Sequence, residues 1–264
     1  MNKTPQLLIN NGFVTDENGV LTEMVIPASV TTVQAPAKVT IYGDNIDYIP
    51  STTAALQVLE LKGYPAFVKN QFKSYTSLNT LTLSKLTGLT DRYHSPGAEN
   101  NVGCFNGLTS LVTLNAPELA SIESVFTGAY NPGQGSGTFR GTGMVNLYLP
   151  KLTTITHNSD WKNGSSNGIF NGCVSLVTIN LPMINSIGSN SDSGGSGNGA
   201  FGNCTSLTTV TLGSEGHPVS VISPLAFTNC TQSGLTITVY TVDGLAISGS
   251  PWGATNATIV WEEA

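Results

Sequence analysis

The chain has 264 residues, enough for one large domain or two small ones, and a formal net charge of -6 at pH 7. Only 10% of its residues are charged, well below the average for soluble proteins, so neutral hydroxyl and amide groups must keep it soluble. The acidic balance and the lack of any Lys/Arg cluster argue against nucleic acid or an anionic membrane surface as partner, because both attract concentrated positive charge.

The sequence contains no run of 18 or more apolar residues, so we expect no insertion into a membrane. Asn10 and Asn11 interrupt the apolar stretch near Met1 before the core of a secretion signal forms. Three explanations stay open: the sequence is a mature segment with a new Met1, the protein leaves the cell by another route, or it stays inside. The neutral surface favours the first, and with it an extracellular or cell-surface location; a cytoplasmic or phage-borne location is the alternative.

Residues 13–21 contain two β-type segments on either side of Asn18-Gly19, which predicts a β-hairpin. We expect residues 1–20 to form an N-terminal cap. Two short repeat units follow, one over 21–30, which includes the element IPASV, and one over 56–61.

From residue 72 the repeats lengthen and become very similar to one another. The copy at 170–182, FNGCVSLVTINLP, is followed 31 residues later by FGNCTSLTTVTL at 201–212. Earlier copies are FKSYTSLNTLTL at 72–83, FNGLTSLVTLNAP at 105–117 and FRGTGMVNLYLP at 139–150, and FTNC at 227–230 opens a sixth. The copy at 139–150 lacks one residue between its Phe and its strand.

Each copy predicts a short helical or turn segment that begins at the Phe and leads into a strand. In the copy at 170–182, Ile179 and Leu181 would point inward while Thr178 and Asn180 point outward. One unit cannot bury its apolar residues alone, so the units must stack, with their strands in a parallel sheet at a spacing of roughly 4.8 Å. Ile184 then begins the return of the chain across the core.

This pattern, F-x-x-C-x-S-L-x-x-I-x-L-P, together with IPASV, resembles the BspA-type leucine-rich repeats of bacterial surface proteins over roughly residues 20–240. It differs from the better-known leucine-rich consensus because its Cys precedes the strand. The resemblance implies a leucine-rich-repeat solenoid, a right-handed superhelix that is mostly β with short helical turns and one parallel sheet. It also implies a surface-exposed protein, since some members of this family are adhesins that bind host matrix proteins or other bacteria.

We assign the solenoid to residues 21–240 and a C-terminal cap to residues 241–264. Residues 235–240 and 257–261 are predicted strands joined by a Gly/Pro-rich loop around Trp252. Caps are expected because an exposed terminal repeat would leave a sheet edge and core uncovered.

The cysteines Cys173, Cys204 and Cys230 each follow their Phe by three residues. We expect them to stack as buried thiols rather than disulfides, because parallel side chains on adjacent repeats rarely meet the geometry of a disulfide. Cys104 precedes its Phe, and the sequence leaves open whether it is buried or partly exposed.

Two motifs of catalytic type occur without their structural context. Residues 164–168 fit G-x-S-x-G and residues 197–202 fit G-x-G-x-x-G, but neither follows a predicted strand as those sites require. One carboxylate, Asp192, is too few for a calcium site in the last insert. We therefore expect no enzyme activity, no cofactor and no metal.

Four polar inserts, at 92–103, 128–138, 156–167 and 189–198, occur at nearly the same phase of the repeat, so stacking would bring them to one edge. Their aromatic rings beside Asn and Asp suit a sugar, while the alternative is that they are mobile polar loops. The outward strand positions form a second candidate surface, rich in Thr and Asn. The candidate partner-binding residues are Tyr93, His94, Tyr130, Asn131, Asp160 and Trp161 on the inserts and Tyr148 on the strand face.

These observations favour a monomeric, non-catalytic bacterial cell-surface binding or adhesion module that recognises a protein or a glycan. A phage-tail or other structural component is the alternative.

Overall fold

The computed structural model describes eleven segments of the chain: residues 6–8, 13–15, 21–24, 38–41, 58–61, 72, 75–93, 103–126, 137–158, 168–189 and 199–264. Regular structure in these segments is almost entirely β, and the one helical element is a short 3-10 helix, η1 (Val242–Gly244). No helix in the described part of the chain has the length and apolar character needed to cross a membrane.

The N-terminal strands form an antiparallel sheet of three. Strand β2 (Phe13–Thr15) pairs with both β1 (Gln6–Leu8) and β3 (Leu21–Met24). The antiparallel pairing of β2 with β3 confirms the strands of the predicted hairpin. Strand β3 also covers the start of the first expected repeat unit, and its antiparallel pairing differs from the parallel stacking predicted there.

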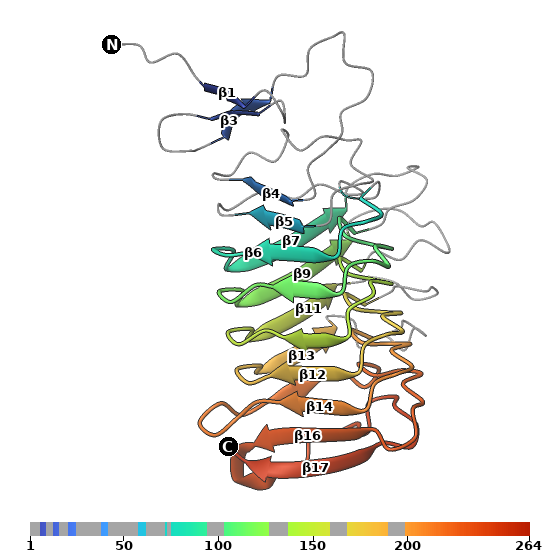
Figure 1. Ribbon diagram of the computed structural model, residues 1–264. Helices are drawn as coiled ribbons and strands as arrows, with labels where there is room; N and C mark the ends of the chain where they lie inside the picture. Colours follow the sequence, from blue (N-terminus) through green and yellow to red (C-terminus); the bar gives the residue numbers. More distant parts are fainter. Residues whose placement is uncertain are drawn as a thin grey trace.

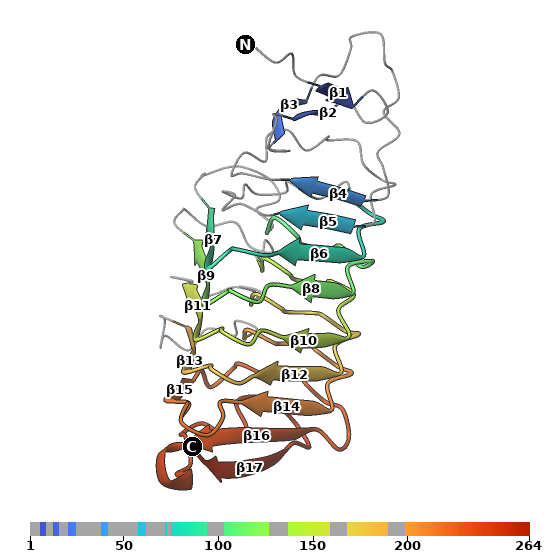
Figure 2. The same cartoon turned by 60° about the vertical axis from the view of Figure 1, so that its left-hand side comes forward.

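All other ladders are parallel, and they form two columns of strands that run along the molecule (Figures 1 and 2). The first column begins with a sheet of β4 (Lys38–Ile41), β5 (Val58–Leu61), β6 (Thr80–Leu83) and β8 (Thr113–Asn115). It continues with a sheet of β10 (Asn146–Tyr148), β12 (Thr178–Leu181), β14 (Thr209–Leu212), β16 (Thr236–Thr241) and β17 (Thr258–Glu263). The second column is one sheet of β7 (Gly88–Tyr93), β9 (Ser121–Phe126), β11 (Thr154–Asn158), β13 (Ser186–Ser189) and β15 (Val221–Ile222).

The strands of the first column form at the positions where apolar and polar residues alternate. Ile179 is opposite Val210 in the ladder between β12 and β14, and both side chains are buried. Their outward neighbours are polar and at least partly exposed. The repeat therefore sets the register, because a shift by one residue would place the apolar side chains in water.

The second column corrects the expectation of one parallel sheet. Ile122, Ile155 and Ile187, which belong to the segments expected only to return the chain across the core, lie side by side in the ladders of β9, β11 and β13. All three are buried. Each of the five repeats that begin at Phe72, Phe105, Phe139, Phe170 and Phe201 thus contributes one strand to each column, and the apolar core lies between the columns.

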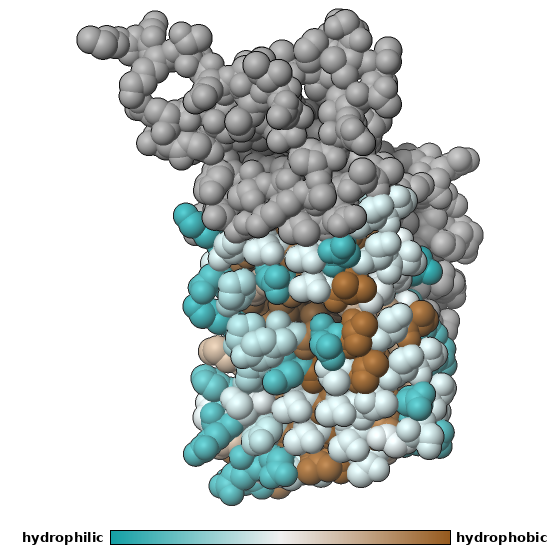
Figure 3. All heavy atoms as spheres, in the orientation of Figure 1, coloured by the Kyte–Doolittle hydropathy of each residue, from teal (hydrophilic) through white to brown (hydrophobic). Residues whose placement is uncertain are grey.

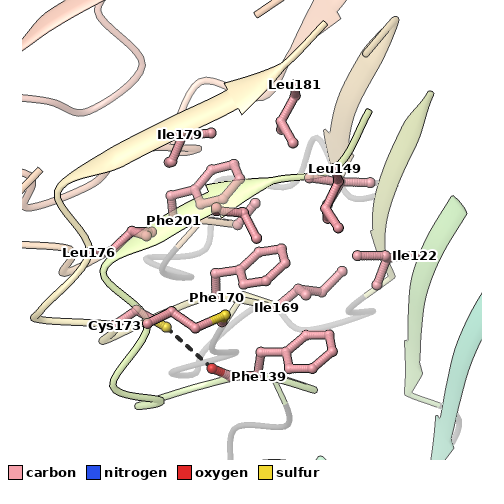
Figure 4. Close-up of a cluster of buried hydrophobic side chains, with 14 of the residues drawn as sticks. Ile122, Phe139, Leu149, Ile169, Phe170, Cys173, Leu176, Ile179, Leu181 and Phe201 are labelled. Carbon is pink, nitrogen blue, oxygen red and sulfur yellow. Dashed lines mark hydrogen bonds between the residues drawn. The ribbon is translucent and has the colours of Figure 1, made fainter. Parts of the chain in front are cut away.

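The Phe residues that open the repeats form a continuous buried stack (Figure 4). Five successive ring pairs, from Phe72 to Phe227, have centroid distances between 4.7 and 5.4 Å and interplanar angles of at most 13°. The segments that carry them are turns and not the short helices that the sequence left possible. These turns hydrogen bond from one repeat to the next, as when the Phe170 amide donates to the Ala200 carbonyl at 2.8 Å.

At the C-terminal end, Trp252 is fully buried and follows the Phe stack, with its ring 6.4 Å from Phe227 and 5.9 Å from Trp261. Strands β16 and β17 agree with the strands expected at 235–240 and 257–261, and they pair in parallel. The expected C-terminal cap segment thus contributes the last strand of the first column.

Candidate functional site

From β6 to β16, the outward face of the first column consists of neutral polar side chains in register. Thr178 lies between Asn146 and Thr209, and Asn180 lies between Tyr148 and Thr211. Hydrogen bonds across the strands order this face, since the Thr178 hydroxyl donates to Asn146 Oδ1 at 2.7 Å and Asn115 Nδ2 donates to Thr82 Oγ1 at 3.4 Å. In Figure 3 the molecule is viewed in the orientation of Figure 1, and pale and teal residues dominate the coloured surface.

One interruption breaks this column. Strands β8 and β10 follow one another in it, but among the described residues no ladder joins them. A groove of about 400 Å³ opens at this place. Its lining residues are Val112, Thr113, Leu114, Asn115, Ala116, Pro117, Asn146, Tyr148 and Pro150.

The groove results from the residue missing in the repeat at 139–150. Met144 is the fifth residue after Phe139, whereas Leu111 is the sixth residue after Phe105. Because the Phe rings still stack at 5.3 Å, the shorter connection draws Gly143 against the preceding repeat. Its amide donates to the Leu108 carbonyl at 3.4 Å, and a β-carbon at Gly143 would overlap the carbonyl oxygen of Thr109.

The lining of the groove combines apolar and neutral polar residues. Leu114 keeps 8% of its surface exposed there, whereas its ladder partner Leu81 keeps none. Tyr148 is 57% exposed and stands on the β10 side. Asn115 and Asn146 lie on opposite sides, on β8 and β10 respectively.

No lining residue carries a charge. The nearest charges in sequence are Glu118 and Lys151, which follow the lining residues Pro117 and Pro150 and form an ion pair of 2.6 Å with each other. This pair joins the turns after β8 and β10, so the two strands are tied beyond the groove although no ladder joins them. The groove is thus electrically neutral and is held at both ends.

The predicted thiol stack is confirmed. Cys173, Cys204 and Cys230 are free and buried, and each thiol donates to the carbonyl of the Phe that opens the preceding repeat, at 3.2, 3.4 and 3.2 Å. Figure 4 shows the bond from Cys173 to Phe139. Burial raises the pKa of all three thiols, most strongly that of Cys204. They therefore stay protonated at neutral pH and serve as packing groups.

The structure answers the question that the sequence left open for Cys104. The residue is buried, with 1% of its surface accessible. It occupies the position just before the Phe, where Thr138, Ile169 and Ala200 are also buried in later repeats. The segment that precedes each Phe is therefore part of the core.

The polar inserts leave from neighbouring strands. Tyr93, Phe126, Asn158 and Ser189 end β7, β9, β11 and β13, which are adjacent in one sheet. The chain returns from each insert at a glycine; these glycines are Gly103, Gly137, Gly168 and Gly199. Each one packs so tightly against the backbone of the next repeat that an added β-carbon would overlap it. The two ends of successive inserts are thus stacked, as the common phase predicted.

The structure describes two of the seven predicted site residues. These are Tyr93, whose backbone ends β7, and Tyr148, which lies at the groove. The other five lie outside the described residues: His94, Tyr130, Asn131, Asp160 and Trp161. The serine of the G-x-S-x-G segment also lies outside them. The groove was not predicted from the sequence, and neither were its lining residues Asn115 and Asn146. The one sequence feature that could have indicated it is the residue missing before Met144.

No model of a known protein family and no curated protein matches this chain. Its function is therefore argued from the residues and their arrangement.

Proposed function

We propose that this chain is a non-catalytic binding module of the BspA-type leucine-rich-repeat class, a right-handed solenoid displayed on the bacterial cell surface, which recognises a protein or a glycan. The observation that carries the proposal is the neutral polar face of the first column with one groove at its break. Flat, ordered faces of this kind suit recognition, because few side chains need to be ordered when the partner binds.

The composition supports a surface role as well. A chain with only 10% charged residues relies on hydroxyl and amide groups, which form hydrogen bonds with partners without a large cost for removing water from charges. A second candidate surface is the edge where the four inserts leave neighbouring strands of the second column. Binding thus has two candidate locations, the groove face and the insert edge.

An array of glycans and extracellular-matrix proteins, probed with the full chain, tests this proposal. Specific binding to any array member supports it, and binding to none overturns it. Replacement of Tyr148 by Ala, compared with the double replacement of Tyr130 and Trp161 by Ala, assigns the face. Binding that survives the double replacement excludes the insert edge, and turnover of an ester substrate that Ser166→Ala abolishes would overturn the non-catalytic assignment.

A further inference from the structure

We propose that the groove between β8 and β10 is a subsite for one or two units of an uncharged sugar, with Tyr148 as the stacking ring and the amides of Asn115 and Asn146 as the polar contacts. This inference rests on the proposed binding function and specifies its ligand class. A groove of about 400 Å³ falls within the range of small-molecule sites.

The two amides are held in complementary orientations. Asn146 Oδ1 accepts a hydrogen bond from Thr178, which leaves its Nδ2 as a donor. Asn115 Nδ2 donates to Thr82, which leaves its Oδ1 as an acceptor. A sugar hydroxyl both donates and accepts, so neighbouring hydroxyls of one ring satisfy both amides.

The Tyr148 ring supplies the apolar half of the site. Sugar rings present a face of C–H groups, which carry a slight positive charge and pack on the electron-rich face of an aromatic ring. More than half of the surface of Tyr148 is already exposed, so the residue does not have to be uncovered before contact. Val112 and Leu114, which also line the groove, provide apolar surface for the edge of the sugar.

Charge excludes other ligand classes. A sugar acid or an amino sugar would find no opposite charge among the lining residues, and the adjacent Glu118 and Lys151 already neutralise each other. A proline-rich peptide is bound by grooves with several aromatic side chains, whereas this groove has one. An uncharged sugar matches the one aromatic ring and the two amides of the lining and requires no charged partner.

Saturation-transfer NMR on the full chain tests the proposal with methyl glycosides of glucose, galactose, mannose and N-acetylglucosamine, and with glucuronic acid and glucosamine as charged comparators. At least one uncharged glycoside should bind, and more tightly than either comparator. Tyr148→Ala should weaken this binding about tenfold or more, which corresponds to about 1.4 kcal/mol. Tyr148→Phe should retain it, because the ring is kept.

Two further variants sharpen the test. Asn146→Asp keeps the acceptor for Thr178 but removes the free donor and adds a charge, so it should weaken binding to a similar degree. Tyr240→Ala removes a ring from β16 in the same column, away from the groove lining, and should leave binding unchanged. Circular dichroism confirms that each variant is folded.

The proposal is overturned if no uncharged glycoside binds, or if binding is equal in Tyr148→Ala and the unaltered chain. Failure here together with a protein hit on the array would leave the binding function standing and remove only the sugar. An array without any hit would remove the binding function itself.

Discussion

Gly143 packs so closely against Thr109 of the preceding repeat that no side chain fits between them. This contact compensates for the residue missing from the repeat at 139–150, and it allows the Phe stack to continue while β8 and β10 separate. The break in the column thus falls at the repeat that is one residue shorter.

Gly143→Ala should lower the free energy of unfolding by about 2–4 kcal/mol, because the added methyl group meets backbone that cannot move without disturbing the core. Urea denaturation measures the change. Gly188→Ala is the matched control, since a β-carbon at Gly188 meets nothing within 4 Å, and it should alter the stability by less than about 0.5 kcal/mol. Equal effects of the two substitutions would contradict the close contact.

Phe170→Ala should destabilise the protein by about 3–5 kcal/mol, because it leaves a cavity in the middle of the ring stack and removes two stacking partners. Its ring lies 5.4 Å from Phe139 and 5.3 Å from Phe201. Val174→Ala, at an exposed position of the same turn, should change stability by less than about 0.5 kcal/mol. A small effect at Phe170 would mean that the stack carries little of the stability.

All four thiols should resist alkylation in the native protein, because all four are buried. In addition, the raised pKa values of Cys173, Cys204 and Cys230 keep these three thiols protonated. Iodoacetamide followed by mass spectrometry should find no modified cysteine under native conditions and four after unfolding. Rapid modification of Cys104 in the folded protein would contradict its burial.

Stability should fall as the pH rises above about 9. Burial raises the pKa of Cys230 from its ordinary 9.0 to about 11, so between these values the unfolded chain loses a proton that the folded chain keeps. The stabilising contribution is complete below pH 9 and is lost toward pH 11, with a loss of about 3 kcal/mol for a pKa difference of about two units. Urea denaturation at a series of pH values should show a smaller decline for Cys230→Ala than for the unaltered chain.

The strands of the first column could be predicted because each repeat has two inward residues and two outward ones, as in Thr178–Leu181. The second column was not predicted, because a strand such as β13 has a single buried side chain, Ile187, between Ser186 and Gly188. Alternation over so few residues gives no period. Only the stacking of several such isoleucines in one sheet makes the strand favourable.

One part of the candidate site could likewise be predicted from the sequence and the other part could not. Tyr148 was identified from its outward position on the strand, and it lies at the groove. The groove itself depends on how a deletion is absorbed by the two neighbouring repeats, which is a tertiary effect. The missing residue was visible in the sequence, but its consequence at Gly143 and Thr109 requires the positions of both backbones.

From the repeat at Phe72 to the repeat at Phe201, consecutive repeats are joined in three ways: by a ladder in each column and by the Phe stack. Between β8 and β10 one of these three connections is missing. Since the stability of stacked repeats is a sum over neighbouring interfaces, this junction should be the weakest one in the interior of that stretch. Unfolding that spreads through the repeats from one end should therefore stop first at this junction. The chain should then unfold as two cooperative units, which amide hydrogen exchange distinguishes by two levels of protection.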